Sequence, residues 1–397
     1  MSRIVFFSIP AHGHTNPTLG VVRELVSRGH QVWYYSYEAF REKIEAAGAT
    51  FIPCDPYDAE QKLTPKDGAR LAKDLAFSTK VLVDTTLALD EIICRDMEHL
   101  KPDCIVADSM ALWGKLAALK LKIPFVSSTT TFAFNRHSSK IMKQSPGNLL
   151  TMMASMPKIN KQLKRLQAAG YPVKSILDII SNDNETDTIV YTSPEFQPCS
   201  ETFSERYAFV GPSIRPAETS VEKQRDHLIY ISMGTVNNDM PALYRSCIQA
   251  LKDSDCQAIL SVGEQIDPSQ FVPLPDHISV YSHVDQIAVL QQTDVFLSHC
   301  GMNSVSESLY YGVPLVMLPG TTEQGGVAAR VEQLGAGIRL TDTTATAIRE
   351  AVEQMLHTAE YRKNAESIAE SFKKCSGVHG AADKILSVCS QNSSRHK

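Results

Sequence analysis

The chain alternates short apolar runs with longer segments in which apolar residues recur every three or four positions. The run 4–9 is almost continuously apolar, as in a strand that is buried on both faces. The segment that follows keeps its apolar residues on one helical face and ends at Gly29. Asn16 and Pro17 are of the types preferred at the N-cap and first turn of such a helix. The sequence therefore predicts a strand, a loop over 10–15 and a helix from Asn16.

The same alternation continues to the end of the chain. It predicts a long helical region over 68–100 and a mixture of helix and loop over 138–181. Further strands are predicted at 32–35, 50–52, 104–107, 125–128, 188–192, 228–233, 258–262, 278–281, 295–298, 315–318 and 337–340. Repeated strand–helix–strand units indicate an α/β fold with parallel sheets covered by helices on both faces.

A change of composition divides the chain into two halves. Residues 211–220 are rich in Pro, Ser and Gly, as interdomain linkers are. We predict a Rossmann-like domain over 1–212, a linker over 213–225 and a second Rossmann-like domain over 226–397, with C-terminal helices able to cross back to the first domain. Two doubly wound domains that face each other would leave a cleft at the carboxyl ends of both sheets.

Composition excludes several classes of function. The net charge is -5 and no block of Lys or Arg stands out, so nucleic acid is not expected as a partner. The nine cysteines form no CxxC pair and their number is odd, which favours a reducing, cytoplasmic compartment. No apolar stretch reaches the ~20 residues that span a bilayer, and the run 4–9 is too short for a signal peptide.

The sharpest motif is Ser-His-Cys-Gly-Met-Asn-Ser-Val-Ser-Glu over 298–307, where a predicted strand turns into a helix. Gly301 allows close approach of a ligand to the backbone, and Asn303 or Ser304 can cap the helix. The open N–H groups and the dipole at a helix N-terminus favour a pyrophosphate. His299 can add a side-chain donor. The alternative is an ordinary strand–turn–helix joint that binds nothing.

Three further segments of the second half suit parts of a nucleotide-sugar. The loop 232–235 offers small residues and hydroxyls next to phosphates, although it also fits a plain glycine turn. The segment 282–286 could hold a nucleobase through its backbone and Gln286. Glu323 and Gln324 could bind sugar hydroxyls, whereas Glu323 also fits a helix first turn stabilised by the dipole.

The first half carries a candidate general base. His14 follows the first strand, and an imidazole suits proton transfer near neutral pH. Asp108 ends the fourth predicted strand, which a doubly wound sheet places near the first, so its carboxylate can hold the ring. Asp108 could instead cap the next helix, and His14 could simply bond nearby backbone. His12 and His14 have no convincing third partner for a metal site.

Together these motifs resemble the family 1 UDP-dependent glycosyltransferases. The resemblance is carried by HCGMNSVSE, GVPLVMLP and EQ between 283 and 324, and it extends over essentially the whole chain. The segment 10–17, Pro-Ala-His-Gly-His-Thr-Asn-Pro, is similar to the bacterial macrolide-type branch. The resemblance implies the GT-B fold, which consists of two facing Rossmann-like domains, here an acceptor-binding domain over 1–212 and a nucleotide-sugar donor-binding domain over 226–397.

The resemblance also implies roles for individual residues. His14 would be the base and Asp108 its partner. The diphosphate of the donor would contact Ser232, Gly234, Thr235 and His299, together with the backbone of Gly301, Asn303 and Ser304. The ribose would be bound by Glu307, and the uracil by Gln286 and backbone near Val284. The sugar would be bound by Glu323 and Gln324. Many family members have Trp where this chain has His283, and Pro where it has Asp285. A histidine stacks on a base with less area than a tryptophan, so the sequence indicates a nucleotide-sugar more strongly than it indicates uridine as the base.

The predicted reaction is a single inverting displacement that moves a hexose, glucose by preference, from UDP to a hydroxyl of a small apolar acceptor such as a macrolide, flavonoid or other phenol. No metal or other cofactor is expected.

Residues that could line the acceptor site, or alternatively pack a small helical core, are Phe132, Phe134, Met142, Met152, Met153 and Met156. The alternatives are a nucleotide-sugar epimerase and a non-catalytic nucleotide-sugar-binding partner protein. A nicotinamide dehydrogenase is excluded because no GxGxxG follows a strand.

Overall fold

The computed structural model describes residues 1–55, 70, 74–135, 137–138, 146–180, 182, 184–235 and 238–395, and the side chains of all of these except 146–154 and 392–395. The chain folds into two compact units. Unit 1 comprises Met1–Tyr191, Cys199–Ser213 and Ser376–Lys397, and unit 2 comprises Thr192–Pro198 and Ile214–Cys375. The last helix, α14 (Gly377–Arg395), therefore belongs to unit 1.

Unit 1 is built on a seven-stranded sheet in which every described pair of neighbours is parallel. Its order is β3-β2-β1-β4-β5-β6-β7. The strands are β1 (Arg3–Phe7), β2 (Gln31–Ser36), β3 (Thr50–Pro53), β4 (Cys104–Asp108), β5 (Phe125–Thr129), β6 (Asp187–Val190) and β7 (Tyr207–Phe209).

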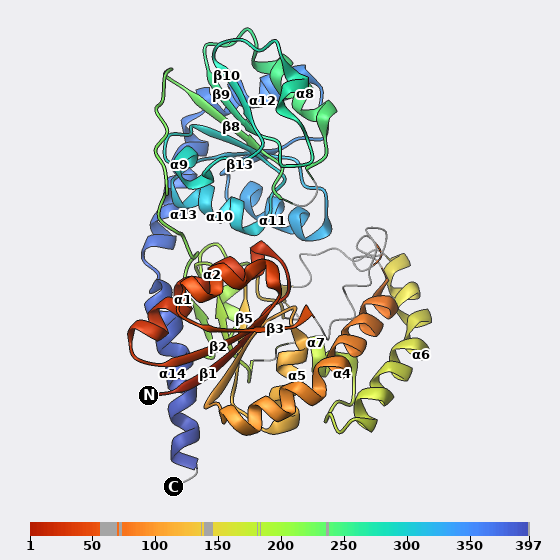
Figure 1. Cartoon of the computed structure of the whole chain (residues 1–397). Helices are drawn as coiled ribbons and strands as arrows, with labels where there is room; N and C mark the ends of the chain where they lie inside the picture. Colours follow the sequence, from red (N-terminus) through yellow and green to blue (C-terminus); the bar gives the residue numbers. More distant parts are fainter. Residues whose placement is uncertain are drawn as a thin grey trace. The chain divides into compact units, whose positions relative to one another are not determined.

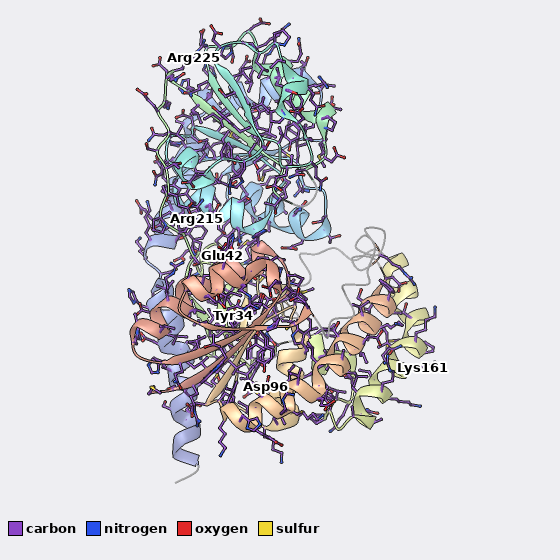
Figure 2. All side chains as sticks on the ribbon, viewed as in Figure 1. Tyr34, Glu42, Asp96, Lys161, Arg215 and Arg225 are labelled. Atoms are coloured by element: carbon purple, nitrogen blue, oxygen red, sulfur yellow. The ribbon has the colours of Figure 1, made fainter. Side chains whose placement is uncertain are left out.

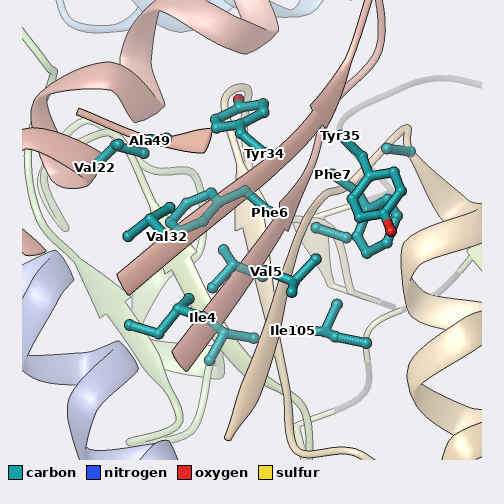
Figure 3. Packing of buried hydrophobic residues seen from close by; sticks show 14 of the residues in the cluster. Ile4, Val5, Phe6, Phe7, Val22, Val32, Tyr34, Tyr35, Ala49 and Ile105 are labelled. Carbon is teal, nitrogen blue, oxygen red and sulfur yellow. The ribbon is translucent and has the colours of Figure 1, made fainter. Parts of the chain in front are cut away.

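Helices cover both faces of this sheet (Figure 1). One face packs against α1 (His12–Ser27) and α14, and the other against α4 (Leu75–Leu100) and α5 (Leu112–Leu121). Figure 3 shows how successive residues of β1 turn to opposite faces: Phe6 stacks on Tyr34 and Phe7 on Tyr35. The described part of unit 1 also contains the α-helices α2 (Arg41–Ala46), α6 (Pro146–Ala168) and α7 (Ile176–Ile180).

Unit 2 repeats the design with six parallel strands in the order β10-β9-β8-β11-β12-β13. Its core packs α8 and α12 against one face of the sheet, and α9, α10 and α11 lie on the other (Figure 1). The elements are β8 (Leu228–Ser232), α8 (Pro241–Leu251), β9 (Gln257–Ser261), β10 (Ile278–Tyr281), α9 (Gln286–Leu290), β11 (Val295–Ser298), α10 (Met302–Tyr310), β12 (Leu315–Met317), α11 (Thr322–Gln333), β13 (Gly337–Arg339), α12 (Ala345–His357) and α13 (Ala359–Lys373).

Each sheet reverses its strand order at one point. In unit 1 the reversal lies between β1 and β4, and in unit 2 it lies between β8 and β11. The chain leaves these adjacent strands in opposite directions around the sheet, which opens a crevice at their carboxyl ends where such folds bind ligands. At the first point, Asp108 ends β4 and His14 lies in the segment that follows β1. At the second point, Ser232 ends β8 and His299 directly follows β11.

Two predicted elements differ from the structure. Helix α1 begins at His12 and not at Asn16, because the amides of His14 and Thr15 both donate to the carbonyl of Ala11. His14 thus lies in the first helical turn, and Pro17 lies inside the helix. The segment predicted as mixed contains the 23-residue helix α6, which buries Ile159, Leu163 and Leu166.

Within the described residues, no helix combines the length and apolarity that crossing a bilayer requires.

Candidate functional site

His14 and Asp108 form a direct pair at the reversal point of the first sheet. His14 Nδ1 lies 2.8 Å from Asp108 Oδ2, and the carboxylate is fully buried while the imidazole keeps 18% of its side chain exposed. An ionised carboxylate can only accept a hydrogen bond, so Nδ1 carries the proton and donates it. This tautomer makes Nε2 the basic nitrogen of the ring, as proton abstraction requires.

Local structure fixes both members of the pair. Asp108 Oδ1 accepts from the amide of Met110 at 2.8 Å, so the other carboxylate oxygen is the one turned to the ring. The helix that carries His14 is held by a buried contact of 3.1 Å between the hydroxyls of Ser8 and Thr15. The predicted alternative for Asp108 does not apply, because the N-cap residue of α5 is Ala111.

Thr130 is a third residue at the same nitrogen, which the sequence analysis missed. Its Oγ1 lies 3.1 Å from His14 Nδ1, and the side chain is buried directly after β5. Because Nδ1 carries the proton, this hydroxyl oxygen can only be a second acceptor. Thr130 lies in a run of Ser and Thr residues without a distinctive motif, but its place after the strand next to β4 is a usable signal.

His12, the other histidine of the segment, packs edge-on against Phe40. Burial, reinforced by the positive charge of Lys43, lowers the pKa of His12 below its ordinary value. In the described part of the chain, no cluster of three or more His, Cys, Asp or Glu side chains is arranged to hold a metal ion.

His299 occupies a tight niche at the reversal point of the second sheet. A Cβ at Gly234 would lie 2.5 Å from the imidazole Cε1, and a Cβ at Gly301 would lie 2.7 Å from Nε2. Gly234 has φ +78, which also favours glycine. Nδ1 of His299 is buried and has no hydrogen-bond partner among the described residues. Burial lowers the pKa of His299, although a hydrogen bond between the ring and the Ser232 backbone opposes that effect, so the ring is neutral at neutral pH.

Helix α10 begins beside His299 without a side-chain cap. Its N-cap is Gly301, whose φ of -60 and ψ of 136 are extended, and no side chain bonds the amides of the first turn from that position. Asn303 and Ser304, the predicted diphosphate neighbours, are half-buried in that turn. An uncapped helix start next to a neutral imidazole offers hydrogen-bond donors and a favourable dipole to an anion.

Glu307 lies one turn further along α10, and it is bonded to Gln286, the first residue of α9. Gln286 Nε2 donates to Glu307 Oε2 at 2.5 Å, and Tyr230 donates its hydroxyl to Gln286 Oε1 at 3.2 Å. Burial raises the pKa of Glu307, although the bond from Gln286 opposes that effect. The two predicted contacts for ribose and base thus lie side by side. Val284 is half-buried just before them, and His283 is exposed.

The remaining predicted donor residues lie at the ends of β8 and β12. Ser232 is buried and accepts a long bond of 3.4 Å from the amide of Gly234, while Thr235 is exposed. Gln324 forms a capping box at the start of α11: its Oε1 accepts from the amide of Thr321, whose hydroxyl accepts from the amide of Gln324. Glu323 is exposed in the first turn of α11. Gln324 thus has a structural role that the sequence analysis did not foresee.

The candidate acceptor residues separate into three groups. Phe132 is buried close to Thr130, whereas Phe134 is 41% exposed. Met156 packs against the small core between α4, α5 and α6. Met142 lies outside the described residues, and the side chains of Met152 and Met153 on α6 are likewise not described. Phe132 and Phe134 therefore follow closely in sequence the Thr130 that contacts His14, whereas Met156 belongs to a core.

Comparison with known proteins is consistent with this geometry. A family model described as UDP-glucoronosyl and UDP-glucosyl transferase matches residues 213–374. The NDP-glycosyltransferase YjiC of Bacillus licheniformis is 34% identical over 394 residues, which cover 96% of each chain. The uncharacterized UDP-glucosyltransferase YojK of Bacillus subtilis is 31% identical over 405 residues, which cover 98% of each chain.

Among solved structures, the calicheamicin glycosyltransferase CalG4 is similar with a TM-score of 0.81 and 28% identity, over 98% of this chain and 99% of that one. Two Rossmann-like units built in this way are the GT-B fold of glycosyltransferases, as the motifs predicted. The matches extend across both units of the chain. The protein therefore belongs to the UDP-glucuronosyl and UDP-glucosyl transferase family and is a UDP-glycosyltransferase.

Proposed function

We propose that this protein transfers glucose from UDP-glucose to a hydroxyl of a small apolar natural product, with inversion at the anomeric carbon. The observation that carries the proposal is the 2.8 Å bond between His14 Nδ1 and the buried carboxylate of Asp108 at a sheet reversal point. That bond leaves the ring in the tautomer that a general base needs.

In the proposed reaction His14 Nε2 takes the proton of the acceptor hydroxyl as the oxygen attacks the anomeric carbon. The new C–O bond forms as the bond from that carbon to UDP breaks, so an α-linked donor gives a β-glycoside. Asp108 stabilises the imidazolium that results, and Thr130 adds a second acceptor at Nδ1. A positioned base of this kind contributes ~10²–10⁴-fold to the rate.

The donor is proposed to bind unit 2 by its diphosphate at the start of α10. The features that support this are the orphaned Nδ1 of His299, the crowding of Gly234 and Gly301 around the ring, and the uncapped helix start. These donors would stabilise the charge that develops on the departing UDP. Ser232 and Thr235 would lie near the same phosphates, as the family resemblance implies.

The nucleoside and the sugar are proposed to bind residues on either side. Glu307 would bind the ribose hydroxyls, Gln286 and the backbone near Val284 would bind the uracil, and Glu323 would bind the sugar. The capping box of Gln324 uses its Oε1 as an acceptor, so its Nε2 is the group that would donate to a sugar hydroxyl. No metal is part of this proposal.

The acceptor is proposed to bind unit 1 next to His14. Phe134 offers an exposed aromatic ring close in sequence to Thr130, and the relative CalG4 is named for a natural product. A macrolide, a flavonoid or another phenol fits an apolar surface beside a base. We expect broad tolerance, and a panel of phenols and macrolides of which only one compound is glycosylated would contradict it.

Mass spectrometry tests the proposal directly. UDP-glucose and a simple flavonoid are incubated with the protein, and the flavonoid is expected to gain one hexose. A sample without flavonoid is the control and should leave UDP-glucose essentially unchanged. Conversion of UDP-glucose to another UDP-sugar in that control, or no hexose gain with any phenol, flavonoid or macrolide tested, would contradict the proposal.

A further inference from the structure

Asp285 departs from the family pattern, which often has Pro at its position. Its φ of -70 is the value that a proline ring imposes, so the backbone conformation fits either residue. Asp285 is the N-cap residue of α9, but its side chain does not bond the amides of that helix. The carboxylate is therefore used elsewhere, although its side chain is only 7% exposed.

The carboxylate binds the segment that leads into unit 2, residues 214–225, which we call the connecting segment. Asp285 Oδ1 accepts from Arg215 Nη2 at 2.5 Å, and Oδ2 accepts from the amides of Glu218 at 2.6 Å and Thr219 at 3.0 Å. The Thr219 hydroxyl adds a longer bond of 3.4 Å. Figure 2 labels Arg215 and Arg225, which mark the two ends of the segment.

These bonds are strong because the acceptor is charged. A carboxylate that accepts from a guanidinium and two amides forms charge-assisted bonds, roughly twice as strong as neutral ones. Burial disfavours the charge of Asp285, but the bonds from Arg215, Glu218 and Thr219 outweigh burial and hold its pKa at about 2. The carboxylate is thus ionised at neutral pH.

The residue after Asp285 is Gln286, which bonds Glu307 and Tyr230. Two adjacent residues therefore link the connecting segment on one side to the proposed ribose and base contacts on the other. Any displacement of residues 215–219 acts on the start of α9, and through it on Gln286. A proline at position 285 could fix the same φ, but it could accept no bond from the connecting segment.

We infer that Asp285 is a positioning residue for the nucleoside end of the donor, which holds the base-binding segment 282–286 in place by anchoring it to the connecting segment. This inference rests on the proposed function, because it takes 282–286 as the part that receives the nucleobase. Binding of UDP should in turn stabilise the contact between Asp285 and residues 215–219.

A matched pair of variants tests the inference. Asp285→Asn keeps the size of the side chain but removes its charge. Asp294→Asn is the control. Asp294 Oδ2 also anchors the connecting segment, accepting from Lys223 Nζ at 2.6 Å, and it accepts from the amide of Leu228 at 2.8 Å, but Asp294 directly precedes β11 and is not part of 282–286. Both variants lose a charge-assisted anchor, and only one of the anchors touches the base-binding segment.

The measurement is the Kd for UDP by calorimetry, with the donor KM and kcat of transfer. We expect Asp285→Asn to weaken UDP binding and raise the donor KM about tenfold, with little change in kcat at saturating donor, and Asp294→Asn to change neither Kd nor KM. Amide hydrogen exchange gives a second readout: UDP should slow exchange in 214–220 of the native protein and not in Asp285→Asn.

The outcomes separate this inference from the proposed function. Native protein that binds UDP with an affinity unchanged in Asp285→Asn overturns this inference alone, as does an equal loss in Asp294→Asn. Native protein that binds no UDP overturns the proposed function, and the inference with it. If Asp285→Asn does not fold, Arg215→Gln removes one of the bonds and leaves the carboxylate; it should weaken UDP binding in the same direction by a few fold, and unchanged binding overturns the inference.

Discussion

The histidines at the two sheet reversal points of this protein differ in their hydrogen bonding. At the first, His14 is bonded by Asp108 and Thr130, and its Nδ1 has acceptors supplied by the chain itself. At the second, His299 is enclosed by two glycines, and its buried Nδ1 has no hydrogen-bond partner among the described residues. The same topology thus supports an imidazole whose Nδ1 is paired in unit 1 and an imidazole whose buried Nδ1 is unsatisfied in unit 2.

The difference indicates that the two histidines have different roles, one as a base and the other in ligand binding. A catalytic base must have one tautomer and one orientation before the substrate arrives, so its partners are built into the fold. A group that binds a ligand gains affinity when its hydrogen-bonding capacity is satisfied by that ligand, because a buried polar atom without a partner costs about 1–3 kcal/mol. On this account unit 1 supplies the chemistry, and unit 2 supplies most of the donor affinity.

The largest expected effect comes from removing the paired imidazole. His14→Ala should lower turnover by about 10²–10⁴-fold, because the acceptor hydroxyl loses its base. The Kd for UDP should stay within about twofold of the native value, because His14 lies outside the proposed donor contacts. Transfer rates and calorimetric titration of UDP on the same preparation check both halves. Unimpaired transfer would show that His14 is not the base.

The second effect tests the niche around His299 in unit 2. Gly234→Ala adds a methyl group 2.5 Å from the His299 ring at a residue with φ +78, so the ring or the loop must move. We expect the Kd for UDP to rise at least about tenfold, or ~1.4 kcal/mol. Gly325→Ala on α11 is the control, because a Cβ there meets nothing within 4 Å. Equal Kd values for the two alanine variants would refute the proposed niche.

A smaller effect sharpens the description of the paired imidazole. Thr130→Val keeps the shape but removes the second acceptor at Nδ1, and a single hydrogen bond of this kind is worth about 1 kcal/mol. Turnover should fall about two- to tenfold. The acidic limb of the pH–rate profile should move to lower pH, because the imidazolium loses a stabilising acceptor. Thr130→Ser, which keeps the hydroxyl, should restore the native profile; a profile unchanged in Thr130→Val would assign Thr130 a packing role only.

The last effect concerns stability and not turnover. The pKa of Asp285 lies at about 2 in the folded protein, below the ordinary 3.8 of an Asp side chain. A depressed pKa contributes stability that is present above pH 3.8 and is lost as the pH falls towards 2, here about 2 kcal/mol. Asp285→Asn should therefore lower Tm at pH 7 by a few degrees, and the difference from native protein should narrow as the pH falls from 5 towards 2. A Tm difference that does not vary with pH would contradict this account of the bonds from Arg215, Glu218 and Thr219.

The sequence predicts the features that depend on periodicity and strand order. Buried strands with polar residues at their carboxyl ends are visible from the apolar pattern, and a doubly wound order then places Asp108 beside the segment of His14. Features that depend on a single side-chain contact were not predictable. Thr130 is one of several hydroxyl residues in its run, and neither the helix start at His12 nor the capping box of Gln324 follows from periodicity.

The stereochemistry of the product tests the central claim, which is direct attack by an acceptor hydroxyl that His14 deprotonates. Native protein is incubated with UDP-α-glucose and a simple phenol, and the anomeric proton of the glucoside is observed by NMR before any further reaction. The account predicts the β-anomer as the first product. An α-glucoside as the first product would require two displacements or a different geometry of attack, and would contradict the account.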